Sequence, residues 1–183
     1  MQASGWEIAT HGLRWIDYQN VPEDVERAHM REAIALHTQV TGAAPLGWYQ
    51  GRTSPNTARL VVEEGCFLYD ADSYADDLPY YDRQYGKPQL VVPYTLDVND
   101  MKFAALNGFT EGEQFFHYLR DTFDMLYREG GRMMSVGLHC RLAGKPARAL
   151  AVARFLEHVA AHTDVWVATR ADIARHWQKV HPA

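Results

Sequence analysis

Apolar and polar residues follow one another along this chain in a pattern that predicts strands alternating with helices. Short apolar runs that stop at polar or turn-forming residues predict six strands, at 6–10, 47–50, 66–70, 89–94, 132–139 and 164–168. Between them, apolar residues recur at helical spacing. The predicted helices run from Pro22 to Gly42, from Pro55 to Gly65, from Thr110 to Glu129, from Pro146 onward and from Thr169 onward.

Local end signals support these helices. Pro22, Pro55 and Pro146 are each suited to a first turn, and Ser54 is placed to cap the helix that Pro55 would begin. The stretches 110–113 and 169–172 both read as capping boxes. Gly42, Gly65 and the glycine pair after Glu129 can end their helices.

A strand–helix order of this kind predicts an α/β fold with parallel strands and crossover helices, either a barrel or an open sheet. A length of 183 residues suits a single domain spanning 1–183. The acidic, tyrosine-rich stretch 71–88 interrupts the order and is predicted to be an ordered functional loop.

Composition excludes several classes of partner. A net charge of −5 and a pI near 6.0 argue against nucleic acid and anionic membranes. The first residues resemble no signal peptide, and no apolar run is long enough for a membrane span. Cys66 and Cys140 suggest neither a disulfide framework nor a CxxC metal site. Two unpaired thiols fit a reducing cytoplasm, which is the expected location.

Polar residues collect after the predicted strands, where α/β folds place their chemistry. They are His11, Arg14, Arg52, Asp70, Asp72, Asp76, Asp77, Asp97, Asn99, Asp100 and His139. Histidines, an arginine and carboxylates together suit hydrolysis, in which water is activated and a leaving nitrogen is protonated. The aspartates of 70–77 could instead only cap and solvate their loop, whereas His139 at a strand end favours function.

The spacing around His11 tests for a metal site. A second histidine four residues later would make a plausible metal pair, but that position is Trp15. His11 is therefore the only candidate ligand, and tightly held zinc is not expected. A dinucleotide glycine fingerprint, a P-loop and a GxSxG elbow are also absent from the sequence.

Five segments together resemble the polysaccharide deacetylase (NodB-homology) superfamily, and within it the cofactor-independent allantoinase branch of urate catabolism. The segments are HGLRW at 11–15, GRTSPNT at 51–57, DSYADDLPY at 72–80, YTLDVNDM at 94–101 and SVGLHC at 135–140. The resemblance runs from about Gly5 to Arg175. It implies a (β/α) barrel and hydrolysis of a carbon–nitrogen amide bond, with allantoin opened to allantoate.

The resemblance also implies residue roles. His139 matches the histidine proposed as general acid, and Arg52 matches the arginine of the third deacetylase motif. His11 would bind or polarise the carbonyl or the water. Substrate binding would fall to Trp15, Arg14, Asp77, Asp97 and Asn99. No cofactor is expected, because Trp15 stands where metal-dependent relatives carry their second histidine.

One departure concerns the first family motif, an acidic pair that supplies the catalytic base. No such pair precedes Gly5, so we expect an incomplete barrel of about six parallel strands, resembling the C-terminal two-thirds of a relative. Open barrel edges are a liability that must be covered, so a homo-oligomer is expected.

Two other functions stay open. The first is a zinc-dependent N-acetyl-sugar (polysaccharide or peptidoglycan) deacetylase, which would use the same fold with an N-acyl substrate in place of a small ureide. The second is a non-catalytic remnant that binds a ligand or assembles with a partner.

Overall fold

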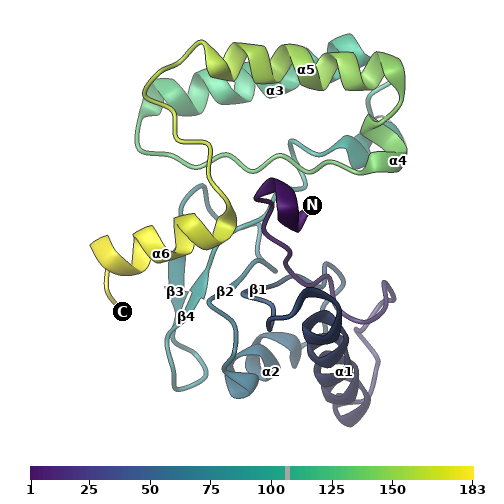
Figure 1. Cartoon of the computed structure of the whole chain (residues 1–183), viewed down its shortest axis with the longest axis vertical. Coiled ribbons are helices and arrows are strands. Elements are labelled where there is room, and N and C mark those ends of the chain that lie inside the picture. The colour runs from purple at the N-terminus through teal and green to yellow at the C-terminus, as the bar shows by residue number, and fades with distance from the viewer. Residues whose placement is uncertain (106–107) are drawn as a thin grey trace. The chain divides into compact units, whose positions relative to one another are not determined.

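The computed structural model describes residues 1–105 and 108–183. Two compact units divide the chain, one comprising Met1–Pro93 with Ala168–Ala183 and the other comprising Tyr94–Val167. The prediction of one domain over the whole chain stays a prediction. Each unit is described by itself below (Figure 1).

The first unit contains a mixed four-stranded sheet in the order β1-β2-β4-β3. Its strands are β1 (Gly47–Trp48), β2 (Tyr69–Asp70), β3 (Tyr80–Asp82) and β4 (Gln89–Val91). β1 pairs with β2 and β2 with β4 in parallel, as the sequence predicts. β3 pairs antiparallel with β4 and was not predicted, because it forms within the acidic loop 71–88.

Four helical elements belong to this unit, namely η1 (Gln2–Ser4), α1 (Glu23–Thr41), α2 (Thr57–Glu64) and α6 (Arg170–Val180). α1 follows Pro22 and ends at Gly42, which has a positive φ of 84°, as predicted. α2 begins two residues later than predicted, because residues 54–56 form a turn ahead of it and Asn56 is the N-cap. α6 has the predicted capping box between Thr169 and Asp172.

The core of the first unit joins α1, α2 and the sheet. Its buried residues are Met30, Ala33, Trp48, Leu60, Val61 and Phe67. A ladder of ion pairs links the outer faces of the two helices, with Arg59 bonded to Glu23 at 2.7 Å and Arg27 to Glu63 at 2.6 Å. The two helices therefore form a stable support beneath the loop that joins β1 to α2.

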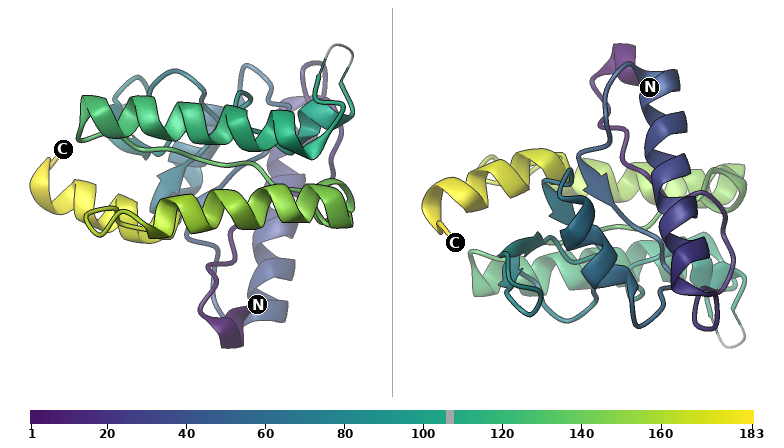
Figure 2. Two further views of the ribbon diagram at one scale, coloured as in Figure 1. Left: turned by 90° about the horizontal axis from the view of Figure 1, so that it is seen from above. Right: turned by 90° about the horizontal axis from the view of Figure 1, so that it is seen from below.

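The second unit is mainly helical. It contains η2 (Asp100–Phe103), α3 (Gly112–Glu129), α4 (Cys140–Ala143) and α5 (Pro146–Ala160). α3 and α5 lie side by side, and residues 130–139 return along them so that both helices point the same way (Figures 1 and 2). The capping box predicted at 110–113 is wrong, because Glu111 is the N-cap and Thr110 bonds to the side chain of Gln114 instead.

The core of the second unit lies between α3 and α5. Val98, Phe115, Phe116, Leu119, Phe123, Ala151 and Phe155 are buried there. The periodicity of α3 predicts an inward stripe of Phe115, Phe116, Leu119, Phe123 and Leu126, and the first four of these are buried. On α5, by contrast, Leu156 is 58% exposed although the periodicity predicts it inward, and Ala151 is buried in the core.

Three of the six predicted strands do not form among the described residues. Residues 6–10 make a single bridge, from Thr10 to Trp48, and residues 132–139 make one from Gly137 to Asn99. Residues 164–168 have no strand. An extended segment becomes a strand only when a neighbour pairs with its N–H and C=O groups, and here the pairing is confined to those bridges.

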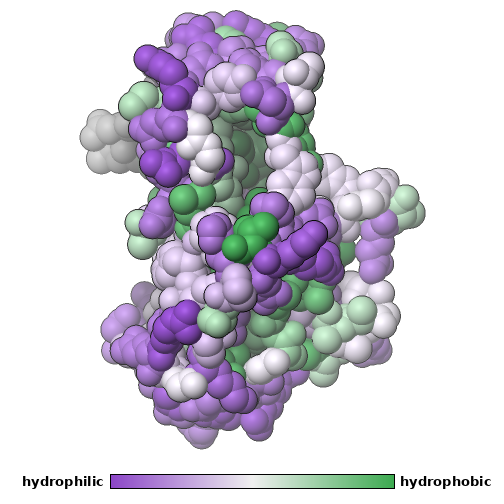
Figure 3. Space-filling model, turned by 90° about the vertical axis from the view of Figure 1, so that its left-hand side faces the viewer, coloured by the Kyte–Doolittle hydropathy of each residue, from purple (hydrophilic) through white to green (hydrophobic). Residues whose placement is uncertain are grey.

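These extended segments expose apolar side chains. Trp6, Trp166 and Val167 are 65%, 59% and 81% exposed. Hydrophobic residues can be seen among hydrophilic ones on the face drawn in Figure 3. Within 1–105 and 108–183, no helix combines the length and the apolar character needed to cross a membrane.

Candidate active site

His11 lies directly after a short parallel contact with the sheet. The N–H of Thr10 donates to the carbonyl of Gly47 at 3.1 Å, and the N–H of Tyr49 donates to the carbonyl of Thr10 at 3.2 Å. Gly12 then takes a φ of 70°, which a residue with a side chain rarely adopts. The turn leaves His11 exposed, with its ring edge-on to Tyr49 at a centroid distance of 4.9 Å.

Asp72 fixes the chain that follows β1. Its carboxylate accepts from the backbone N–H of Gln50 at 2.8 Å and of Gly51 at 2.7 Å. Burial raises the pKa of this carboxyl, while the two N–H groups and the nearby His11 oppose the rise. Asp72 therefore connects the loop after β2 to the loop after β1.

Asp70 is a buried carboxyl beside Asp72. It is 6% exposed at the end of β2, and one of its oxygens accepts from the N–H of Asp72 at 2.9 Å. Burial, followed by the charge of Asp72, raises the pKa of Asp70 to about 7. A carboxyl that titrates near neutral pH can exchange a proton under working conditions.

Arg52 projects from the loop between β1 and α2. Its guanidinium carbon lies 4.5 Å from the centroid of the Trp15 ring, a cation–π contact between two exposed side chains. The carbonyl of Arg52 accepts from the N–H of Tyr18 at 3.1 Å. The structure thus places two of the predicted site residues in contact.

Arg14 and Asp77 are both exposed. Asp77 lies in the loop 71–88, where its N–H donates to the side chain of Asp76 at 2.7 Å. Their predicted role in substrate binding stays a prediction.

In the second unit, His139 is paired with a buried aspartate. Its Nδ1 lies 2.6 Å from Oδ1 of Asp100, which is fully buried. The other oxygen of Asp100 accepts from the N–H groups of His139 at 2.7 Å and Ala143 at 3.0 Å. Because a carboxylate only accepts, Nδ1 carries the proton and Nε2 is left for proton transfer.

Local structure explains this pairing. His139 is the N-cap of α4, and Asp100 is the first residue of η2. The bridge between residues 99 and 137 brings the two segments together, since the N–H of Asp100 donates to the carbonyl of Gly137 at 2.9 Å. The backbone therefore determines the position of the histidine ring.

Asn99 and Asp97 have structural partners. Asn99 is 2% exposed, accepts from the N–H of Met101 at 2.9 Å and donates to the carbonyl of Thr95 at 3.1 Å. Asp97 accepts from the hydroxyl of Tyr118 at 2.5 Å and from Lys102 at 3.1 Å. Their predicted contacts with substrate stay predictions, although these bonds give both residues a role in shaping the loop.

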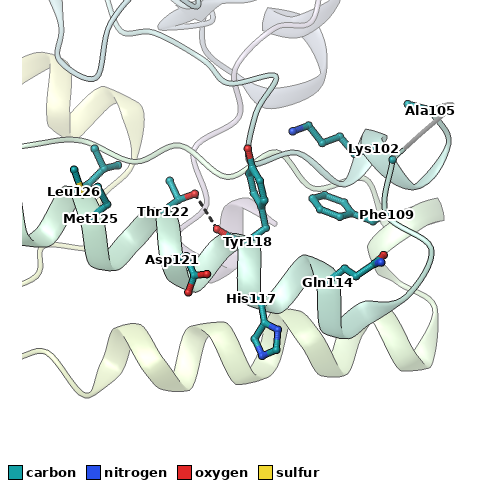
Figure 4. A pocket seen from close by; sticks show the side chains of 11 residues that line it. Lys102, Ala105, Phe109, Gln114, His117, Tyr118, Asp121, Thr122, Met125 and Leu126 are labelled. Atoms are coloured by element: carbon teal, nitrogen blue, oxygen red, sulfur yellow. Dashed lines mark hydrogen bonds between the residues drawn. The ribbon is translucent and has the colours of Figure 1, made fainter.

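An open cavity of about 1000 Å³ lies against α3 (Figure 4). Lys102, Phe109, Tyr118 and Met125 are among its lining residues. None of the predicted site residues lines it. The size of this cavity therefore does not identify it as the catalytic site.

A protein zinc site needs several His, Cys, Asp or Glu side chains close together. In the described ranges 1–105 and 108–183, no cluster of three or more His, Cys, Asp or Glu side chains could hold a metal ion. Cys66 and Cys140 are free thiols, as the sequence predicts. The described side chains therefore do not fit a zinc ion.

The sequence missed the partners of the predicted residues. His11, Arg14, Trp15, Arg52 and Asp77 belong to the first unit, and Asp97, Asn99 and His139 to the second. Asp70, Asp72 and Asp100 lie among the polar residues that follow the predicted strands, but the sequence assigns none of them an individual role. Asp100 lies in the same segment as Asp97 and Asn99, and spacing cannot tell which of the three is buried.

A curated protein and two solved structures match this chain along its whole length. No family profile matched it. A protein of Schizosaccharomyces pombe, provisionally named a polysaccharide deacetylase, is 41% identical over 202 residues. The alignment covers 100% of this chain and 63% of that protein, so the chain spans less than two thirds of its relative.

Solved structures agree with this match. A structure from Pseudomonas aeruginosa PAO1, provisionally named a polysaccharide deacetylase, has a TM-score of 0.97 and 58% identity, and the match covers all of this chain and 63% of that one. The Puue allantoinase has a TM-score of 0.97 and 57% identity, with 100% and 62% covered. A structure from Mycobacterium smegmatis, also provisionally named a polysaccharide deacetylase, has a TM-score of 0.87 and 26% identity, and the match covers 98% of this chain and 65% of that one.

These matches confirm the resemblance seen in the sequence motifs, and they confirm an α/β fold of the deacetylase type. Similarity extends both to proteins named for deacetylation and to one named as an allantoinase. The chain is therefore similar, along its whole length, to part of the proteins that bear these names.

Proposed function

We propose that this chain carries part of the machinery of an allantoinase-like hydrolase, which opens a cyclic amide of a small ureide such as allantoin to allantoate. The observation that carries the proposal is the pair of Asp100 and His139. A histidine whose Nδ1 is fixed by a buried carboxylate is well arranged to move a proton at Nε2.

The proposed reaction breaks one carbon–nitrogen bond. Water adds its oxygen to the amide carbon and gives up one proton to the surrounding water, and the bond between that carbon and the ring nitrogen then breaks. His139, protonated at Nε2, gives its proton to this nitrogen, which becomes the neutral NH₂ of a ureido group on the opened chain, and His139 regains a proton from the water. Asp100 orients the ring and stabilises its positive charge before the transfer.

Arg52, Trp15 and His11 have the binding roles in this proposal. Arg52, lying over Trp15, presents N–H donors that suit a carbonyl or carboxylate oxygen. His11 is exposed at its turn and would polarise the carbonyl or the attacking water. Similarity to the Puue allantoinase at 57% identity supports a ureide as the substrate.

A metal-dependent N-acetyl-sugar deacetylase is the second candidate. Similarity to the proteins named polysaccharide deacetylases favours it. The position of Trp15 and the lack of a ligand cluster among the described residues weigh against it.

We further propose that the chain self-associates, since apolar side chains of its extended segments are exposed.

Hydrolysis assays distinguish the two candidates. The purified chain is supplied with allantoin or with N-acetylated sugar oligomers, each with a strong chelator and with added zinc. The proposal expects loss of allantoin at a rate that the chelator leaves unchanged. Release of acetate from the oligomers that depends on zinc would establish the deacetylase instead.

A further inference from the structure

The loop that carries Arg52 is tied to a buried glutamate on α1. Glu26 is 1% exposed, and its carboxyl group accepts from three side chains. Ser54 Oγ donates at 2.5 Å, Thr57 Oγ1 at 2.5 Å and Gln50 Nε2 at 3.3 Å. A buried carboxylate is costly to leave unsatisfied, and three donors compensate for that cost.

All three donors lie within the segment 50–57, which comprises the loop after β1 and the first residue of α2. Gln50 and Ser54 lie on either side of Arg52, and Thr57 begins α2. The two hydroxyls also accept from the loop's own backbone, since Thr57 Oγ1 receives the N–H of Ser54 at 2.9 Å and Ser54 Oγ receives that of Asn56 at 2.9 Å. Loss of the carboxylate would therefore loosen side-chain and backbone bonds together.

Asp72 fixes the backbone at the start of the same loop. Its carboxylate binds the N–H groups of Gln50 and Gly51, and Gly51 has a φ of 81°. Arg52 follows directly, exposed and with its guanidinium over Trp15. A long side chain on an exposed loop keeps one position only if the backbone beneath it is fixed.

We propose that Glu26 is a positioning residue for Arg52 and acts through Gln50, Ser54 and Thr57. This inference rests on the proposed function only because that function gives Arg52 a role in binding substrate. None of the three side chains that donate to Glu26 is itself a predicted substrate-binding residue. The effect of Glu26 on turnover passes through the loop. Three donors matched to an acceptor-only group distinguish Glu26 from the exposed glutamates of the same helix.

The test compares Glu26→Gln with Glu32→Gln, an exposed glutamate on the same helix. Glutamine has nearly the shape of glutamate but offers an NH₂ group where the loop needs an acceptor. Hydrogen exchange of the segment 50–57 should be at least about tenfold faster in Glu26→Gln and unchanged in Glu32→Gln. Segments of α3 serve as an internal reference, and exchange unchanged at 50–57 would overturn the proposal.

A second pair of variants follows the same connection without touching Glu26. Thr57→Ser keeps the hydroxyl that donates to Glu26, whereas Thr57→Val removes it at similar size. The proposal expects faster exchange at 50–57 in Thr57→Val and near-normal exchange in Thr57→Ser. Equal exchange in both variants would contradict it.

Kinetics then show whether the loop acts through Arg52. If it does, kcat/KM for the double variant Glu26→Gln/Arg52→Lys should match Arg52→Lys alone within about twofold. If the two substitutions instead lower kcat/KM by factors that multiply in the double variant, Glu26 and Arg52 act independently. That result would overturn the positioning role even if hydrogen exchange at 50–57 is faster in Glu26→Gln. If the wild-type chain hydrolyses no amide, the proposed function fails, while the exchange measurements still decide the claim about the loop.

Discussion

Asp100 and His139 are 39 positions apart in the sequence, yet Oδ1 of Asp100 lies 2.6 Å from Nδ1 of His139. The aspartate also accepts two backbone N–H groups, from His139 at the N-cap of α4 and from Ala143, the last residue of that short helix. One fully buried carboxylate thus both caps a helical turn and orients an imidazole. The proposed chemistry depends on this double role.

Replacing Asp100 by Asn should lower turnover by about 10²- to 10⁴-fold, because an amide NH₂ can face Nδ1 and favour the wrong histidine tautomer. Binding of substrate should change far less than kcat. Asp121→Asn, an exposed change on α3, is the matched control. A turnover for Asp100→Asn equal to that of the control would show that the aspartate only caps α4.

Gly137→Ala should destabilise the second unit by about 1–3 kcal/mol. An added Cβ would lie 2.3 Å from Asn99 Nδ2 and 2.6 Å from the hydroxyl of Tyr94, so these side chains must shift and strain the bridge between residues 99 and 137. Urea unfolding measures the loss. Leu138→Ala, at a neighbouring side chain that is 47% exposed, should be nearly neutral. Equal midpoints for the two variants would show that the bridge has no energetic importance.

Asp70 should make stability depend on pH between about 4 and 7. Its folded pKa of about 7 is above the ordinary value of 3.8, so the folded chain binds more protons than the unfolded chain in that range. Stability contributed by the protonated carboxyl is therefore lost as pH rises from 4 to 7. Chemical unfolding of the wild type and of Asp70→Asn at several pH values measures this, and the asparagine variant should show a flatter profile. Parallel profiles would place the pKa of Asp70 in its ordinary range.

Arg52→Lys should lower kcat/KM by about tenfold or more with little change in melting temperature. A lysine keeps the charge but loses the planar donor fork and most of the stacking on Trp15. The side chain is exposed, so the fold does not depend on it. Steady-state kinetics with thermal unfolding check both parts. A fall in stability without a change in kcat/KM would assign Arg52 to the fold alone.

The helices could be predicted from the sequence because their signals are local. Pro22 with Gly42, and Thr169 with Asp172, act within one or two turns of the helix ends they mark. Strands depend on distant partners, so the runs 132–139 and 164–168 looked like strands and yet form none here. β3 was missed for a different reason, since its partner β4 is near in sequence but Tyr80–Asp82 lies within the acidic stretch 71–88, which is typical of a loop.

The site was predictable to a similar degree. His139 could be singled out because it ends an apolar run within a recognisable motif. Its partner Asp100 could not, since an aspartate between an asparagine and a methionine gives no sign that it is fully buried. Glu26 likewise looks like one of several acids near the start of α1, and only its three donors from the loop 50–57 distinguish it.

The most direct test of the account is the turnover of allantoin by His139→Ala, compared with the wild-type chain and with Leu138→Ala. General acid catalysis by a positioned histidine contributes about 10²- to 10⁴-fold, so His139→Ala should turn over at least about a hundredfold more slowly while Leu138→Ala stays near normal. A His139→Ala variant that is folded and retains near-normal turnover would contradict the account.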